Sequence, residues 1–169
     1  GTSGVAKVWN YSSGIPLFEY QTLPVAQATK WSDDGTQIAI GRGTVVEIID
    51  GTNGSHMFTF GSNLDMINFD WHPDSTTNHL VTVDVERCIR IWDTSTGNEV
   101  DSFCNTGVEP DYMLTVDYSS DGNEIITGDQ TGQVIFWDPT TWTPTRTIQN
   151  TGAVSSLAVG ETGGVVLGD

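Results

Sequence analysis

The chain has 169 residues, of which 37% are apolar, and its formal net charge at pH 7 is −16. This length fits one domain with a core of its own. A chain this acidic repels phosphate groups. We therefore expect neither nucleic acid nor an anionic membrane surface among its partners. No apolar run approaches the ~18 residues that a transmembrane helix requires, and residues 1–5 lack the basic and apolar pattern of a signal peptide.

Apolar and polar residues alternate along most of the chain, which is typical of strands with one buried face. No segment has the helical period of 3.6. In chain order, the expected strands are residues 5–9 and 16–21; 25–31, 37–41, 45–49 and 55–60; 65–71, 79–84, 88–92 and 99–104; 112–118, 124–128, 133–137 and 144–149; and 153–159 and 164–168. The sequence therefore predicts an all-β fold.

One strand ending recurs four times along the chain. The four endings are Val8-Trp9-Asn10, Ile48-Ile49-Asp50, Ile91-Trp92-Asp93 and Phe136-Trp137-Asp138. They follow one another at 40, 43 and 45 residues, and tight turns rich in Asp and Gly recur at matching offsets, at residues 31–35 and 118–122. A four-stranded unit repeated in this way favours a β-propeller over a β-sandwich.

The Trp-Asp endings, the Ser-x-Asp-Gly turn and the period of about forty-two residues resemble WD40 repeats over essentially the whole chain. The resemblance implies an all-β propeller built from four WD40-type four-stranded repeats, either as a single module of residues 1–169 or as part of a larger ring. The expected blades are residues 22–62, 63–104 and 105–150, with a fourth from 151–169 and 1–21. One departure is that no histidine occupies the family's Gly-His position, which leaves the hydrogen-bond network of that histidine incomplete.

The fourth blade is expected to be split between the N- and C-termini. The sequence of residues 165–169 is similar to that of residues 125–129. The sequence of residues 1–9 is similar to that of residues 130–137, which directly follow residues 125–129. Three arrangements are compatible with this pattern. One chain closes a four-bladed ring, two chains share their split blades in an eight-bladed ring, or the repeats belong to a longer chain or polymer.

Two cysteines flank the third strand ending. If a hairpin turns near Thr96, Cys88 and Cys104 face each other across neighbouring strands, within the reach of a disulfide. The alternative is two free thiols.

The triplets that begin at Asn10 and Asn53 fit the N-glycosylation pattern in expected hairpin loops, although such triplets also arise by chance. With the scarcity of lysine, these features favour an extracellular over a cytoplasmic location, and the compartment stays unassigned.

No catalytic or cofactor-binding constellation is present in the sequence. His72 precedes a proline in a turn and is expected to be structural, and no His/Cys cluster has zinc spacing. We therefore expect no enzyme activity, cofactor or metal. The tryptophans at the strand endings, Trp9 among them, are expected to pack in the core, and so is Trp31. Trp142 lies in a hairpin loop and is a candidate exposed contact.

The resemblance implies a non-enzymatic protein-interaction scaffold that binds a protein partner, as yet unknown, through a loop face of the propeller. Carried over residue by residue, that face contains Arg42, Glu86, Arg87, Glu109, Asp111, Tyr112 and Gln130, and Trp142 is a further candidate. The alternative is a structural, self-assembling protein, extracellular and glycosylated, in which copies of the chain complete each other's split blade. An enzyme is the third and least favoured hypothesis.

Overall fold

The computed structural model describes residues 4–22, 25–61, 65–104 and 112–168. Within these ranges the chain forms sixteen strands and one short 3-10 helix, η1 (Ser75–Thr77), which confirms the predicted all-β fold. The strands are β1 (Gly4–Asn10), β2 (Ile15–Thr22), β3 (Ala28–Trp31), β4 (Gln37–Arg42), β5 (Val45–Asp50), β6 (His56–Gly61), β7 (Met66–Trp71), β8 (His79–Asp84), β9 (Cys88–Asp93), β10 (Glu99–Cys104), β11 (Met113–Tyr118), β12 (Ile125–Asp129), β13 (Gln133–Asp138), β14 (Thr143–Gln149), β15 (Ser156–Val159) and β16 (Val165–Gly168).

These strands form three four-stranded antiparallel sheets and two hairpins. Sheet 1 contains β3–β6, sheet 2 contains β7–β10 and sheet 3 contains β11–β14, each in chain order. The N-terminal hairpin is β1–β2 and the C-terminal hairpin is β15–β16. Each four-stranded sheet falls within one of the predicted repeat ranges.

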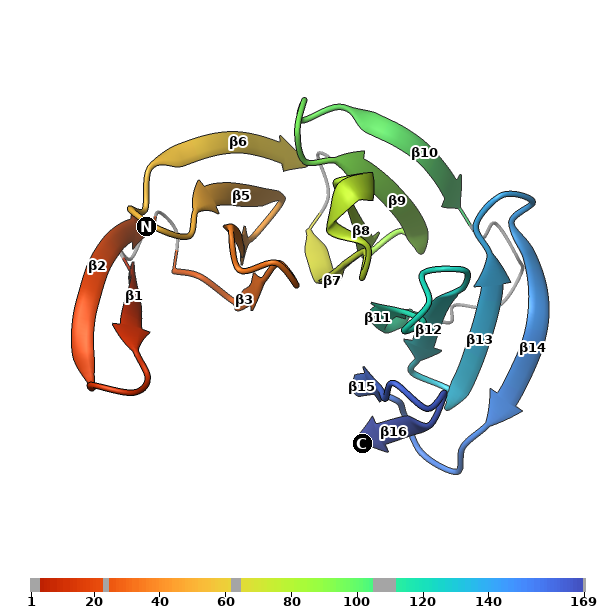
Figure 1. The fold of residues 1–169 in the computed structure, drawn as a ribbon. Helices are drawn as coiled ribbons and strands as arrows, with labels where there is room; N and C mark the ends of the chain where they lie inside the picture. Colours follow the sequence, from red (N-terminus) through yellow and green to blue (C-terminus); the bar gives the residue numbers. More distant parts are fainter. Residues whose placement is uncertain (1–3, 23–24, 62–64, 105–111, 169) are drawn as a thin grey trace.

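The sheets and hairpins stand side by side in an open arc (Figure 1). The first strand of each sheet, with β15, lines the inner side of the arc, and the last strand of each sheet, with β2, forms the outer rim. Successive sheets radiating from a common centre are the hallmark of a propeller-like fold. The repeat pattern of the sequence predicts this arrangement.

The predicted split blade is not confirmed. The two hairpins lie at opposite ends of the arc, with three complete sheets between them. In the described ranges, β1 pairs with β2 alone and β16 pairs with β15 alone. The halves of the fourth blade are therefore both present as hairpins, but within this single chain they do not meet.

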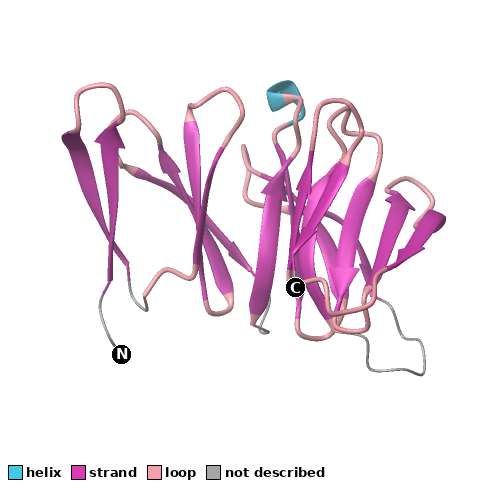
Figure 2. Cartoon of the chain, turned by 90° about the horizontal axis from the view of Figure 1, so that it is seen from below, coloured by secondary structure: helices cyan, strands magenta, loops and turns pink. Residues whose placement is uncertain are grey.

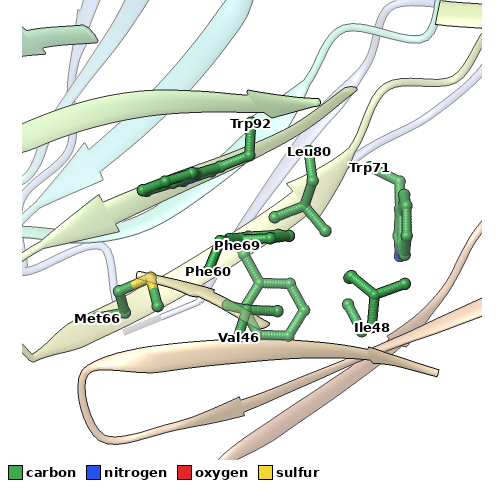
Figure 3. Close-up of a cluster of buried hydrophobic side chains, with 9 residues drawn as sticks. Val46, Ile48, Phe60, Met66, Phe69, Trp71, Leu80 and Trp92 are labelled. Carbon is green, nitrogen blue, oxygen red and sulfur yellow. The ribbon is translucent and has the colours of Figure 1, made fainter. Parts of the chain in front are cut away.

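Neighbouring sheets pack face to face through alternate residues of their strands. Figure 3 shows the cluster between sheets 1 and 2, where Phe60 of β6 stacks on Trp92 of β9 with 4.9 Å between the ring centroids. Phe103 of β10 and Trp137 of β13 form the matching contact between sheets 2 and 3, at 5.2 Å. An outer-strand aromatic on one sheet thus covers the third-strand tryptophan of the next.

Close approach of the sheets depends on glycine in the second strand. A Cβ atom on Gly41 would lie 2.6 Å from the Phe69 ring, and one on Gly128 would lie 2.5 Å from a methyl group of Val154. Both distances are shorter than real carbon–carbon contacts allow. Phe69 of sheet 2 therefore packs directly on the backbone at Gly41, and Val154, in the loop that leads into β15, does so at Gly128.

The third-strand tryptophans also donate hydrogen bonds within their own sheets. The Nε1 of Trp92 donates to the hydroxyl of Thr82, and that of Trp137 to the hydroxyl of Thr127, each at 2.9 Å and buried. In sheet 1 the equivalent positions hold Ile49 and Ile40, which are fully buried. Apolar packing therefore takes the place of the tryptophan–threonine hydrogen bond in sheet 1, so this sheet rests more on packing, as expected where the repeat departs from its pattern.

Candidate interaction surfaces

The strands run between two opposite sets of loops, seen from the side in Figure 2. One side is formed by the loops that lead into the first strand of each sheet and by the turns between the second and third strands. We call this side the first loop face. The second loop face carries the remaining turns, including η1. Loops supported in this way by a rigid sheet framework are common places for partner binding.

Five of the predicted contact residues lie on the first loop face: Arg42, Glu86, Arg87, Tyr112 and Gln130. Glu86, Tyr112 and Gln130 are exposed, and the two arginines are half-buried. Glu109 and Asp111 lie outside the described residues. The structure therefore gathers the described members of the set on one side of the arc.

Two buried aspartates at the ends of β8 and β12 hold the turns that carry these residues. The Oδ1 of Asp84 accepts hydrogen bonds from the backbone N–H groups of Glu86 and Cys88. The Oδ1 of Asp129 accepts from the N–H groups of Thr131 and Gln133. Charge-assisted bonds of this kind are among the stronger ones in proteins, so both turns present their side chains from a fixed backbone.

Arg42 occupies the position equivalent to these aspartates, and its chemistry differs. Its guanidinium pairs with Glu47 at 2.5 Å, and this hydrogen bond raises the pKa of Arg42 against the opposing effect of burial. Sheet 2 has the reversed pair, in which Arg90 contacts Asp84 at 3.3 Å. Arg42 therefore serves first to neutralise a buried carboxylate.

Trp142 is held on the second loop face, away from the other predicted contacts. Its ring stacks on Phe103 with 5.7 Å between centroids, and its Nε1 donates to a carboxylate oxygen of Asp101 at 3.0 Å. The side chain is half-buried by these contacts. Trp142 thus connects the outer rims of sheets 2 and 3, a role that its sequence context did not indicate.

Cys88 and Cys104 form a disulfide. They face each other across β9 and β10, with a Cα–Cα distance of 4.0 Å and a sequence separation of 16 residues. The predicted hairpin geometry therefore brings the two sulfur atoms together. The crosslink fastens the outermost strand of sheet 2 to the strand inside it.

The two candidate glycosylation residues lie in exposed turns. The side-chain oxygen of Asn10 accepts hydrogen bonds from the N–H groups of Ser12 and Ser13, and that of Asn53 accepts from Ser55. Both asparagines are exposed in the structure. Their glycosylation stays a prediction, since exposure is required for the modification without being specific to it.

A charged cluster lies on the inner side of the arc, which sequence reasoning missed. The Nζ of Lys30 lies 2.7 Å from Asp70 and 3.1 Å from Asp117, so it bridges carboxylates from two neighbouring sheets. Each carboxylate also accepts a backbone N–H from the strand that follows, from Tyr118 to Asp70 at 2.8 Å and from Val159 to Asp117. Each of the three residues directly precedes the aromatic residue that ends the first strand of its sheet. This shared position in the repeat is the sequence signal that could have predicted the cluster.

Burial governs the protonation of this cluster. Burial, followed by the neighbouring charge of Asp70, raises the pKa of Asp117 to about 6. Burial also raises the pKa of Asp70, although Lys30 opposes the shift. For Lys30 burial disfavours the charge, but the two carboxylates outweigh it and raise the pKa. The cluster borders a hollow of about 550 Å³, which Asp33 and Glu161 also line.

The open ends of the arc expose tryptophans that are buried elsewhere. Trp9 of β1 is 53% exposed, whereas the equivalent Trp92 and Trp137 are 5% and 4% exposed. Trp31 of β3 is 46% exposed, against 6% for the equivalent Trp71. The prediction that Trp9 and Trp31 lie in the core is therefore wrong for this chain, because the strands that would cover them are not beside them.

One segment matches a known family. Residues 106–138 match the family model "WD domain, G-beta repeat". No curated protein matches the chain. The match supports the WD40-repeat resemblance without pointing to a particular member, and WD40 domains are generally non-enzymatic interaction scaffolds.

In the ranges that the structure describes, no group of three or more His, Cys, Asp or Glu side chains could hold a metal ion. Within the same ranges, no helix has the length and apolar character needed to cross a membrane.

Proposed function

We propose that this chain is a non-enzymatic scaffold that binds a protein partner through its first loop face. The observation that carries the proposal is the match of residues 106–138 to the WD repeat, a kind of domain that typically binds proteins. The fixed turns after β8 and β12 support it, because they hold Glu86 and Gln130 exposed on the same loop face as Tyr112, and the N–H of Gln130 donates to the carbonyl of Tyr112 at 3.0 Å. Preorganised backbone lowers the entropic cost of binding.

The proposal can be tested with two matched triple variants used as bait in extracts of the source organism. The first, Glu86→Lys with Tyr112→Ala and Gln130→Lys, changes the first loop face. The second makes the same kinds of change on the second face and at exposed positions: Asp33→Lys, Tyr11→Ala and Thr141→Lys. We expect a partner that binds the unchanged chain and the second variant and loses affinity for the first. Equal binding to all three baits would contradict the proposal.

A second candidate function is that of a structural, self-assembling protein in which copies complete each other's fourth blade. The disulfide and the two exposed asparagines fit an extracellular form.

The extracellular form can be tested by mass spectrometry of the protein from its source, before and after enzymatic removal of N-linked glycans. We expect a mass loss, with Asn10 or Asn53 converted to aspartate. An unmodified mass would refute the glycosylated form, and it would leave the scaffold proposal unaffected.

A further inference from the structure

The disulfide lies in sheet 2, which has a complete sheet on either side of it in the arc (Figure 1). Cys88 and Cys104 form the last cross-strand pair between β9 and β10. The pairs at the equivalent position are Val45–Gly61 in sheet 1 and Gln133–Gln149 in sheet 3. Those two sheets keep their outermost strand paired without a crosslink at this position. The strand pair of sheet 2 therefore has a known, uncrosslinked counterpart on each side.

The two cysteines differ in their access to solvent. Cys104 is exposed on the outermost strand of the sheet, whereas Cys88 is 3% exposed. A thiolate in solution opens a disulfide by attacking one of its two sulfur atoms, and the rate depends on access to that atom. Access therefore favours attack at the sulfur of Cys104, with Cys88 as the leaving group. Exposed disulfides are also the ones that small thiols reduce most readily.

The strand that the disulfide fastens also joins sheet 2 to sheet 3. In the described ranges, β10 pairs with no strand other than β9. The residue before Cys104 is Phe103, whose ring centroid lies 5.2 Å from that of Trp137 and 5.7 Å from that of Trp142. Trp142 also donates its Nε1 to a carboxylate oxygen of Asp101 at 3.0 Å. Release of the end of β10 would therefore loosen the outer part of this junction.

We propose that Cys104 is a thiol–disulfide exchange site, at which a small thiol opens the crosslink and releases the end of β10 from sheet 2. The sulfur of the attacking thiolate bonds to the Sγ of Cys104. The bond between Cys88 and Cys104 breaks, and its electron pair stays on the Sγ of Cys88, which takes up a proton. A second thiol then displaces the first from Cys104. The two thiols supply the two electrons of the full reduction and leave as their own disulfide.

The opened sheet keeps the means to close again. The N–H of Cys88 donates to the buried Asp84 at 3.1 Å, and this hydrogen bond does not involve the sulfur. Cys88 therefore stays in place while the end of β10 moves. The rest of the fold persists, because sheets 1 and 3 are paired at the same position without a crosslink. A small disulfide reverses the exchange by the same steps, so the device is reversible and acts on one strand.

The first test identifies the attacked sulfur in the oxidised, folded chain. Cysteamine is a suitable thiol because it is cationic and the chain has a net charge of −16. The reaction is stopped with acid at short times, which protonates the thiolates, and pepsin fragments are mapped by mass spectrometry. We expect about tenfold or more cysteamine adduct on Cys104 than on Cys88. An equal or reversed distribution would overturn the proposal, and so would exchange that occurs only where urea unfolds the whole chain.

The second test locates the consequence, by hydrogen exchange of the chain before and after reduction with an excess of dithiothreitol. We expect the amides of β10 to exchange about tenfold to hundredfold faster after reduction, because the crosslink no longer limits local opening. The outermost strands of the other two sheets, β6 and β14, are internal controls and should not change. Faster exchange throughout all three sheets, or unchanged exchange in β10, would contradict a device confined to this strand.

A variant without the crosslink is the matched control for both tests. Cys88→Ala combined with Cys104→Ala should show the fast β10 exchange of the reduced chain, whether or not dithiothreitol is present, and far-ultraviolet circular dichroism checks that it folds. A response of this variant to dithiothreitol would show that the thiol acts elsewhere and would overturn the proposal. Should the variant fail to fold, the adduct map of the unchanged chain still decides the attacked sulfur. None of these results depends on a partner, so they fail separately from the scaffold proposal.

Discussion

Replacement of Asp117 by asparagine should stabilise the protein at neutral pH. Asp117 sits beside Asp70 on the inner side of the arc, and its pKa is about 6 when folded against 3.8 as an isolated group. The folded state therefore holds a proton that the unfolded chain has released, and the free energy of unfolding falls as the pH rises between these two values. The full effect is about 3 kcal/mol, at 1.36 kcal/mol for each pKa unit. The neutral amide can still accept the N–H of Val159 and escapes this cost.

The measurement is urea unfolding followed by tryptophan fluorescence, at pH 5 to 8, for Asp117→Asn and the unchanged chain. Lower pH is avoided because the isoelectric point is near 4.1, where proteins tend to precipitate. The difference in free energy of unfolding should grow with pH by about 1.4 kcal/mol over this range, from the same linkage relation. Asp121→Asn is the control: hydrogen bonds from Ser119 and Asn123 lower the pKa of Asp121 to about 2, so its loss should destabilise the protein by an amount that hardly changes between pH 5 and 8. A difference that is independent of pH would refute the reasoning.

Three further changes have expected outcomes by the same urea measurement. Lys30→Met leaves two facing carboxylates without their cation and should cost about 1–2 kcal/mol at pH 8 and less at pH 5; an equal cost at both pH values would contradict this. Trp137→Phe removes the buried hydrogen bond to a threonine and should cost about 1–3 kcal/mol, whereas Trp9→Phe, measured in the monomer, should cost within about 0.5 kcal/mol; similar costs would argue against the difference in burial. Replacing Cys88 and Cys104 by serine should cost about 3 kcal/mol for a loop of this length, and alkylation of the unchanged chain should require prior reduction.

The sequence predicts the strands and their grouping well, because both depend on local patterns. Alternating apolar residues and Asp-Gly turns specify where each strand begins and ends, and a repeated unit specifies which strands form a sheet. The disulfide follows for the same reason, since one hairpin brings Cys88 and Cys104 together. These features need no knowledge of how one sheet sits on the next.

Features that depend on contacts between sheets were harder to predict. The Lys30 cluster joins residues 40 and 87 positions apart, and only the superposition of three first strands brings them into contact. Trp142 was expected to be an exposed contact because its own hairpin offers nothing to bury it. Its partners, Phe103 and Asp101, belong to the neighbouring sheet.

Trp9 illustrates why a residue's repeat position does not determine its burial. This position of the repeat holds a side chain that packs between two sheets. Trp92 and Trp137 each have a threonine hydrogen-bond partner in their own sheet and an aromatic neighbour on the preceding sheet. Trp9 has neither in the single chain. The residue equivalent to the threonine is Leu167, which cannot accept a hydrogen bond. A completed fourth sheet would therefore bury Trp9 by packing alone, as sheet 1 does with Ile49 and Ile40.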